Sequence, residues 1–328
     1  MLFTIGAIVL HMGLMGVVVA NLIGNLINML LSYIYAHRFI PFHFSLDYTR
    51  TSRILKEAFP ISITAILSYV YFTVDTVILS IVHIAGKSNA VEVGIYGSAY
   101  KVLTLLQLIP TILLGNIFPL LTDYVSSDRK RAEGLLQKVF DLVSMVSFPI
   151  TVTVSLLALP IITFIAGSGF APAAVPLRIL AFAVLLTYYN GLFTYTALAL
   201  GRQKGLIWVY LAATVFNISS NLLLIPHYSY IAASYTTMAT EVLVLFGAWL
   251  VCRDAISFRF SLRRPVRFLA ASLVLAALIF PIRHLSILIS GPTAIIAYVL
   301  LLLVFRIVSL SELQALLPSG GTPSLQES

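Results

Sequence analysis

The stretch FPISITAILSYVYFTVDTVILS, residues 59–80, determines how the rest of the chain is interpreted. Asp75 is its only charged residue, and it is long enough to cross a hydrocarbon core about 30 Å thick, which needs about 20 mostly apolar residues. The whole 328-residue chain has the same character, since 60% of its residues are hydrophobic and only 10% are charged. Soluble domains are typically about 25% charged, so this composition excludes a water-soluble globular protein.

Similar apolar stretches on both sides of this segment predict nine membrane-spanning helices. A further apolar stretch, residues 2–10, is too short to cross alone and lacks the basic region of a signal peptide. The expected fold class is therefore an all-α polytopic membrane protein. The expected spans are residues 13–36, 58–83, 92–122, 138–165, 175–200, 204–225, 228–251, 267–282 and 285–307.

Lysine and arginine predict the orientation of these spans. Sixteen of the 20 cations fall in alternate connections, three fall in the opposite ones, and Lys101 lies inside a span. Such an asymmetry indicates that the richer face and the C-terminus are cytoplasmic. It also explains the net charge of +8 without nucleic acid, because no basic patch is interleaved with aromatic residues. The expected location is the cytoplasmic (plasma) membrane.

The connections predict no catalytic or cofactor chemistry. The linker at 37–57 suits either a short amphipathic helix on the cytoplasmic membrane surface or an ordinary solvated loop. Residues 252–266 read as a basic cytoplasmic loop, and the tail at 308–328 as disordered. The single cysteine, Cys252, permits no internal disulfide. Since the sequence shows no phosphate loop, metal-spaced cluster or nucleophile arrangement, neither an enzyme nor a resident cofactor or metal is expected.

Polar residues recur at helical spacing within seven of the nine predicted spans, whereas the last two spans are almost wholly apolar. Residues three or four apart share one helix face, so each series predicts a polar stripe. Interhelical hydrogen bonds are the ordinary explanation of such stripes. Seven stripes that include Asp, Lys and Glu favour a water-accessible cavity instead. The stripes include Asn21, Asn25, Asn28, Ser32, Thr64, Ser68, Tyr71, Asp75, Lys101, Thr104, Thr111, Asp141, Ser144, Thr187, Asn190, Thr194, Tyr210, Thr214, Asn217, Asn221, Ser234, Thr237 and Glu241.

Three charged residues within the spans carry hypotheses of their own. Asp75 and Lys101 are expected at similar depth on adjacent helices, which predicts that they approach each other in at least one conformation. Glu241 is expected deeper, without an obvious partner. It is therefore the best candidate for protonation or ion coupling, with a neutral buried acid as the alternative.

The runs at 59–80 and 93–122 resemble the seventh and eighth helices of Wzx-type polysaccharide flippases, members of the multidrug/oligosaccharidyl-lipid/polysaccharide (MOP) exporter superfamily. LALGRQKG at 198–205 and NISSNLLLIPHYSYIAASYTTMATE at 217–241 are similar to the family's next characteristic stretch. One departure is Ser229, which stands where the family usually has glycine. The resemblance implies a two-lobed, MATE-like helical fold that moves lipid-linked oligosaccharides by alternating access.

On that map, residues 58–251 are the second six-helix lobe and residues 267–307 an added peripheral pair. Residues 1–36 are the remnant of the first lobe. The resemblance therefore implies an incomplete chain, either the later part of a longer flippase or a half-size protein that needs a partner.

The expected substrate is an undecaprenyl-type lipid-linked oligosaccharide, with membrane lipids and possible polysaccharide polymerase or glycosyltransferase partners. Coupling to H⁺ or Na⁺ is expected at Asp75 or Glu241. Alternatives are a MATE-like drug or cation antiporter, a lipid II flippase, and a non-transporting scaffold of a polysaccharide synthesis complex. The candidate translocation residues are Tyr71, Asp75, Lys101, Gln107, Asn190, Asn217 and Asn221.

Overall fold

The computed structural model describes residues 13–39, 48–84, 86–255 and 260–307, and every regular element in these ranges is a helix. Eight of these helices are long and apolar enough to cross a membrane. The all-α, multi-pass architecture expected from the sequence is therefore confirmed for the described part of the chain. The predictions for residues 2–10 and 308–328 fall outside these ranges.

The chain divides into two compact units, residues 1–57 and 58–328. The first unit contains α2, Gly13–Phe39, and the first turns of α3, Tyr48–Ile81. The polar stripe expected on α2 is exposed. In the predicted linker, residues 48–57 are helical and continue directly into the apolar part of α3, while residues 40–47 lie outside the described ranges.

In the second unit, α4, Asn89–Ser127, and α5, Arg129–Leu156, are joined by the single residue Asp128. The Asp128 side chain accepts hydrogen bonds from the backbone N–H groups of Lys130 (3.0 Å) and Arg131 (3.2 Å). These N–H groups have no partner within the helix, and a negative charge is favourable at a helix N-terminus. The cap explains why α5 begins well before the predicted span start at residue 138.

The expected span at 138–165 is broken near its end. α5 ends at Leu156, and the short α6, Ala158–Ala166, follows Leu157. Pro160 has no N–H to donate to the carbonyl of Leu156, so the helical hydrogen-bond ladder cannot continue through this point. The 3-10 turn η1, Ser168–Ala173, then leads to α7, Ala174–Ala199.

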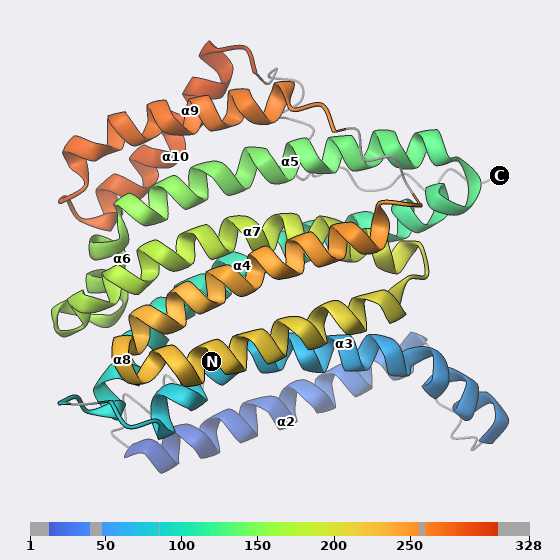
Figure 1. The fold of residues 1–328 in the computed structure, drawn as a ribbon, viewed down its shortest axis with the longest axis horizontal. Helices are drawn as coiled ribbons and strands as arrows, with labels where there is room; N and C mark the ends of the chain where they lie inside the picture. Colours follow the sequence, from blue (N-terminus) through green and yellow to red (C-terminus); the bar gives the residue numbers. More distant parts are fainter. Residues whose placement is uncertain (1–12, 40–47, 85, 256–259, 308–328) are drawn as a thin grey trace. The chain divides into compact units, whose positions relative to one another are not determined.

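α8, Gln203–Cys252, is a helical hairpin (Figure 1). A straight helix of 50 residues would be about 75 Å long, more than twice the hydrocarbon core. Ser229, with φ 53° and ψ −137°, breaks the helical path. We call residues 203–228 the first limb and residues 230–252 the second limb. Each limb is long enough to cross a membrane, so the eight helices supply the nine apolar segments that the sequence predicts.

Contacts between the two limbs define their antiparallel register. A Cβ atom added to Gly247 would lie 2.6 Å from Val209, and one added to Gly205 would lie 3.0 Å from Val251. Both pairs are centred close to Ser229, as expected for a hairpin that reverses at this residue. The two backbones can approach closely at both points only because these positions are glycine.

α7 lies at the centre of the second unit, where it packs against α8, α4 and α5. Gly191 allows α7 to pack closely against α4, since a Cβ atom there would lie 2.5 Å from the Leu114 side chain. The helices that carry most of the predicted polar stripes therefore surround one central helix.

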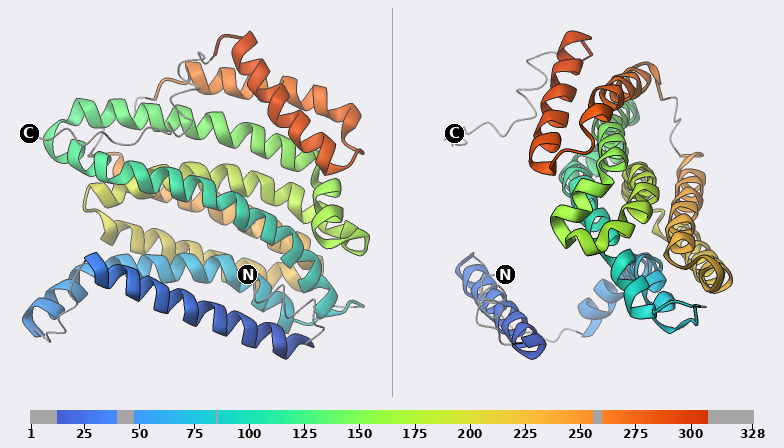
Figure 2. Two further views of the ribbon diagram at one scale, coloured as in Figure 1. Left: turned by 180° about the vertical axis from the view of Figure 1, so that it is seen from behind. Right: turned by 90° about the vertical axis from the view of Figure 1, so that its left-hand side faces the viewer.

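The last elements form a separate layer beside α5 (Figure 2). They are α9, Arg263–Ile279, the turn η2, Phe280–Ile282, and α10, Ile287–Val304. Their shared core is apolar, and the Tyr298 hydroxyl joins it to α5 by donating to the carbonyl of Met145 at 2.8 Å. The two buried serines, Ser272 and Ser290, donate to the carbonyls of Phe268 and Ser286, four residues before each.

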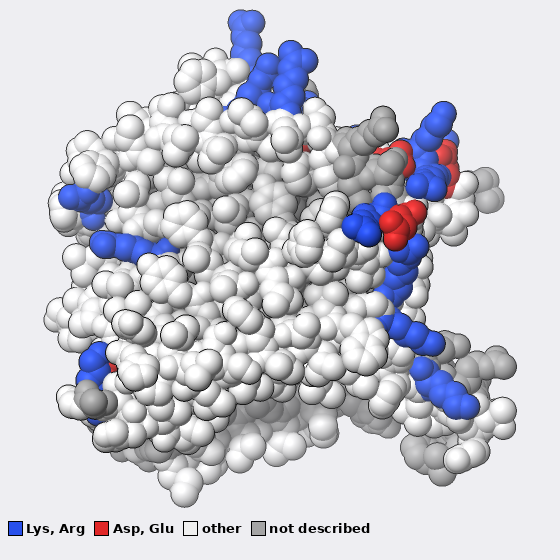
Figure 3. Space-filling view, in the orientation of Figure 1, with Lys and Arg blue, Asp and Glu red and all other residues white. Residues whose placement is uncertain are grey.

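Charged side chains in the view of Figure 3 lie mainly at the ends of the helices, with a broad uncharged belt between them. We call the end with the α4–α5 and α7–α8 connections the basic end. The other end, with the α3–α4 turn, the α8 reversal and the α9–α10 turn, is the distal end (Figure 1). The uncharged belt is the surface expected of a protein surrounded by lipid.

Candidate functional site

The first buried polar group lies where α3, α4 and the two limbs of α8 meet. Asp75 on α3 is fully buried and accepts hydrogen bonds from three uncharged side chains. Tyr96 of α4 (2.8 Å) and Thr237 of the second limb (2.5 Å) donate to Oδ2, and Asn221 of the first limb (2.6 Å) donates to Oδ1. We call these four residues the Asp75 cluster.

The Asp75 cluster continues between the two limbs of α8. The Asn221 amide also donates to Asn217 Oδ1 at 3.0 Å, and the Asn217 amide donates to the Thr240 hydroxyl at 3.2 Å. Both Asn217 and Thr240 are fully buried. Asn221 Oδ1 is buried without a hydrogen-bond partner in the described part of the protein. The cluster thus contains a carboxylate, two hydroxyls and an unpaired amide oxygen.

A second group forms around Glu241, on the second limb. Tyr71 of α3 donates to Glu241 Oε1 at 3.1 Å, and the Asn190 amide of α7 donates to Glu241 Oε2 and, at 3.1 Å, to its backbone carbonyl. We call Tyr71, Asn190 and Glu241 the Glu241 cluster. Within the described residues, Asn190 Oδ1 has no hydrogen-bond partner although it is buried.

The Glu241 cluster forms one wall of a cavity of about 240 Å³ between α3, α4, α7 and α8. Tyr210 of the first limb lies against Tyr71, with 6.2 Å between the ring centroids, and its hydroxyl is 3.1 Å from that of Thr194. Carboxylate, amide and hydroxyl groups face this space together with aromatic rings. The remaining lining residues are Ser68, Phe72, Pro110, Thr111, Leu114, Thr187, Gly191 and Tyr195.

The two clusters are adjacent because they use the same two helices. Tyr71 and Asp75 are four residues apart on α3, and Thr237 and Glu241 are four residues apart on α8. Side chains at this spacing share one helix face and lie about 6 Å apart. Two acidic groups are therefore stacked one helical turn apart within the apolar part of the unit.

A third group holds the distal end together. Lys87, in the α3–α4 turn, forms an ion pair with Glu92 Oε2 at 3.1 Å, and the Ser229 hydroxyl donates to the same oxygen. The Lys87 ammonium also lies 5.3 Å from the centroid of the Tyr230 ring. The reversal of α8 is thereby joined to the turn between α3 and α4.

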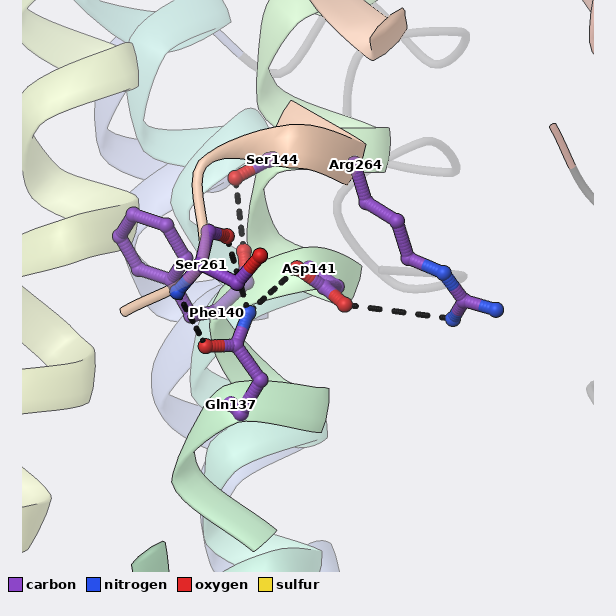
Figure 4. Close-up of polar contacts among 6 residues, drawn as sticks. All are labelled: Gln137, Phe140, Asp141, Ser144, Ser261 and Arg264. Carbon is purple, nitrogen blue, oxygen red and sulfur yellow. Dashed lines mark hydrogen bonds and ion pairs between the residues drawn. The ribbon is translucent and has the colours of Figure 1, made fainter. Parts of the chain in front are cut away.

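Near the basic end, Gln137 of α5 fastens the connection between α8 and α9 (Figure 4). Its amide donates to the Ser261 carbonyl (3.2 Å) and to Asp141 Oδ1 (2.8 Å), and its oxygen accepts from the Ser261 backbone N–H (2.8 Å). Arg264 lies 3.9 Å from Asp141 Oδ2. Both main-chain groups of Ser261 are therefore held by one side chain.

Comparison with known proteins identifies the family. A family model described as "Polysaccharide biosynthesis protein" matches residues 1–175, more than half of the chain. The chain belongs to this family. No curated protein matches it. Among solved structures, it is similar to "Lipid II flippase MurJ, inward closed conformation", with a TM-score of 0.71 and 16% sequence identity.

The match covers 90% of this chain and 62% of the MurJ chain, so the chain spans less than two thirds of the length of that structure. At this identity the likeness shows the fold. The family match and the fold likeness agree with the resemblance seen in the sequence: the chain belongs to a polysaccharide biosynthesis family, and its helical fold is similar to that of a solved flippase.

Six of the eight predicted site residues lie in the two clusters or, for Asn217, beside the Asp75 cluster, whereas Lys101 and Gln107 lie outside them. The six are Tyr71, Asp75, Asn190, Asn217, Asn221 and Glu241. Asp75 and Lys101 are not paired here: Asp75 bonds to Tyr96, and Lys101 is exposed on α4. α4 begins at Asn89, so Tyr96 lies about 10 Å along it and Lys101 about 18 Å. Asp75 lies about 9 Å from the end of α3, which matches the depth of Tyr96.

Glu241, for which the sequence offered no obvious partner, has two in the structure, since Tyr71 and Asn190 both donate to it. Depth along one helix did not reveal side chains that approach from α3 and α7. Gln107 is half-buried, and its Nε2 has no hydrogen-bond partner among the residues that the structure describes.

Sequence reasoning missed Tyr96, Thr237 and Thr240 as site residues. Thr237 belongs to a predicted stripe, and Tyr96 belongs to the run at 93–122 that resembles the flippase family. The i,i+4 spacing of Thr237 and Glu241 was the available signal. Their roles depend on the register of the α8 hairpin, which residue spacing alone does not define.

Proposed function

We propose that residues 58–251 form the second six-helix lobe, and residues 267–307 an added pair, of a flippase that moves lipid-linked oligosaccharides by alternating access. Residues 1–36 would belong to its first lobe. The observation that carries the proposal is the stacking of two acidic polar clusters inside a member of the polysaccharide biosynthesis family. The basic end and the C-terminus would face the cytoplasm, as the distribution of Lys and Arg predicts.

The substrate class proposed is an undecaprenyl-type lipid that carries an oligosaccharide through a diphosphate. Lys101 is exposed in the apolar stretch of α4, although a lysine in mid-membrane costs about 3 kcal/mol unless it is hydrated or paired. Its exposure supports a polar space on this face of the lobe, where Lys101 would meet phosphate or an acidic sugar. Gln107 lies further along α4, and Tyr71 and Asn190 would offer hydrogen bonds to sugar hydroxyls.

The Asp75 cluster is the proposed site of ion coupling, with H⁺ or Na⁺ as the ion. The carboxylate of Asp75, the Thr237 hydroxyl and the unpaired Asn221 oxygen are the kind of oxygen donors that a hard cation prefers. A bound ion would displace the hydrogen bonds that now join α3 to both limbs of α8. Glu241 is the second candidate, because it borders a cavity.

One alternative has an observation in its favour. The fold likeness to a lipid II flippase supports lipid II, itself a lipid-linked saccharide, as the substrate. Antiport of cationic drugs is less well supported, because Lys101 would repel a cation near the acidic residues. A scaffold role would require no ionisable group at mid-membrane.

Complementation tests the proposal. The gene should restore surface polysaccharide to a strain that lacks its lipid-linked oligosaccharide flippase, and the Asp75→Asn and Lys101→Ala variants should not. Rescue by both variants at wild-type level would favour a scaffold. Ethidium efflux, measured in the same cells, should not rise; a rise that depends on Asp75 would favour the antiporter.

A further inference from the structure

A second cavity lies at the distal end, away from the two polar clusters. Its volume is about 380 Å³, within the range of small-molecule sites. One wall is α6, through Leu159, Thr163 and Phe164, and the other is the turn between η2 and α10, from Arg283 to Ile287. Nothing in the proposed transport mechanism uses these residues.

Arg283 is held in a defined position at this cavity. Its guanidinium carbon lies 3.7 Å from the centroid of the Phe280 ring, and its Nε donates to His284 Nε2 at 3.1 Å. Stacking on an aromatic ring and a bond to Nε restrain the guanidinium plane. The terminal amino groups keep four N–H donors, which can bind two oxygens of a phosphate at once.

The polar groups that line the cavity are donors without an acidic counterpart. No lining residue is a carboxylate, and within the described part of the chain no Asp or Glu forms an ion pair with Arg283. Since His284 Nε2 accepts a hydrogen bond, Nδ1 is the ring nitrogen that can donate. Ser286 Oγ accepts from the backbone N–H of Leu288, so its own O–H is available to donate. Arg283, His284 and Ser286 therefore present donors that suit an anion with several oxygens.

The rim of the cavity is apolar and exposed, which indicates that the anion is carried by a lipid. Phe164 is 61% exposed, Leu285 45% and Leu159 40%. These side chains lie at the end of membrane helices, where acyl chains would cover them. A free phosphate would leave this apolar surface in water.

We propose that the cavity between α6 and the α9–α10 turn binds the phosphate group of a lipid in the leaflet at the distal end, with Arg283 as its principal ligand. The lipid phosphate has two sources, a bilayer phospholipid or the diphosphate of a polyprenyl lipid. The inference requires only that the protein lies in a membrane, so it stands independently of the proposed transport. At the distal end, a phosphate site would recruit lipid from the leaflet opposite the basic face.

Native mass spectrometry of the 328-residue chain in neutral detergent tests the site, with phosphatidylglycerol, phosphatidylcholine and undecaprenyl diphosphate as probes. Phosphatidylglycerol should bind more tightly than phosphatidylcholine, and Arg283→Gln should weaken that binding about tenfold. Arg178→Gln is the matched control, because Arg178 is exposed near the same end on α7 but does not line the cavity. It should leave the affinity unchanged.

Competition identifies the source. Displacement of phosphatidylglycerol by undecaprenyl diphosphate, with the same dependence on Arg283, assigns the site to the polyprenyl lipid; failure to displace it assigns a bilayer phospholipid. Equal weakening by Arg178→Gln and Arg283→Gln, or no effect of Arg283→Gln, overturns the proposal. Unfolding midpoints in lipid-free detergent establish that both variants fold, and Ser286→Ala, with an expected loss of about threefold, provides a milder second variant.

Discussion

The centre of the second unit and the α9–α10 pair are built in opposite ways. In the centre, carboxylate, amide and hydroxyl groups from α3, α4, α7 and α8 bond to one another across helix boundaries. In the α9–α10 pair the shared core is apolar, and the two buried serines each donate to a main-chain carbonyl four residues earlier. Polar contacts therefore define which helices of the centre meet, while α9 and α10 pack against each other mainly through apolar side chains.

This difference has a physical consequence in a bilayer. Lipid chains are as apolar as leucine, so apolar helices gain little from leaving lipid, and polar groups provide much of the specificity of association. A buried polar group that loses its partner cannot turn to water instead. Substitutions in the centre should therefore lower the free energy of unfolding more than substitutions of similar size in α9 or α10.

The largest effect is expected at Asp75. Asp75→Ala leaves Tyr96, Asn221 and Thr237 without their shared acceptor, and an unpaired buried group costs about 1–3 kcal/mol. We expect the free energy of unfolding, measured by titration with SDS, to fall by about 3 kcal/mol. Ser290→Ala in α10 is the matched control and should change it by less than about 0.5 kcal/mol, because the Ser290 hydroxyl donates to the Ser286 carbonyl one turn earlier. Equal losses would remove the distinction between the two regions.

Two substitutions of Glu241 distinguish a structural role of this residue from a role in transport. Glu241→Leu should cost about 2 kcal/mol of unfolding free energy, because it removes the acceptor of the Tyr71 hydroxyl and the Asn190 amide. Glu241→Gln keeps an acceptor oxygen but cannot ionise, so its stability should remain near that of the wild type. If Glu241 couples transport to protons, rescue of polysaccharide export by this variant should lose its dependence on external pH. Unchanged pH dependence would leave Glu241 a structural residue.

Ser229 tests how the reversal of α8 is stabilised. Its φ of 53° and ψ of −137° suit glycine, and such strain costs a non-glycine residue about 1–3 kcal/mol. Ser229→Ala keeps the strain and loses the hydrogen bond to Glu92, so unfolding free energy should fall by about 1 kcal/mol. Ser229→Gly loses the bond but relieves the strain, and should be at least as stable as the wild type. If the Ser229→Gly variant is less stable than the Ser229→Ala variant, the backbone at Ser229 is not strained.

The smallest effect is expected across the two limbs of α8. A double-mutant cycle with Asn217→Ala and Thr240→Ala should give a coupling energy of about 0.6 kcal/mol, the average for hydrogen bonds between membrane helices. The same cycle with Asn217→Ala and Ser290→Ala of α10 should give none. A coupling energy of zero for the first pair would mean that this bond does not join the limbs in the bilayer.

Much of the helical architecture could be predicted from the sequence, because apolar length is a direct consequence of bilayer thickness. The limits of single helices were less accurate where local chemistry decides them. The Asp128 cap starts α5 earlier than hydropathy indicates, and Pro160 separates α6 from α5. Ser229 marks a turn that hydropathy locates only to within a few residues.

The candidate site was predicted in part for a related reason. Spacing along one helix identifies a polar face, so Asp75, Asn221 and Glu241 could be selected from the sequence. Which faces meet depends on helix depth and register, and a shift of a few residues exchanged Lys101 for Tyr96 beside Asp75. An exposed cation such as Lys101 has no local signature that distinguishes a cavity wall from a buried ion pair.

The hydrogen bonds between Gln137 and Ser261 determine which helix α9 and α10 would move with. Because the Gln137 carboxamide forms hydrogen bonds with both main-chain groups of Ser261, the connection from α8 is attached to α5 before α9 begins (Figure 4). Tyr298 anchors α10 to the same helix at another point. A movement of α5 would therefore carry α9 and α10 with it, so the pair and α5 would move as one rigid body.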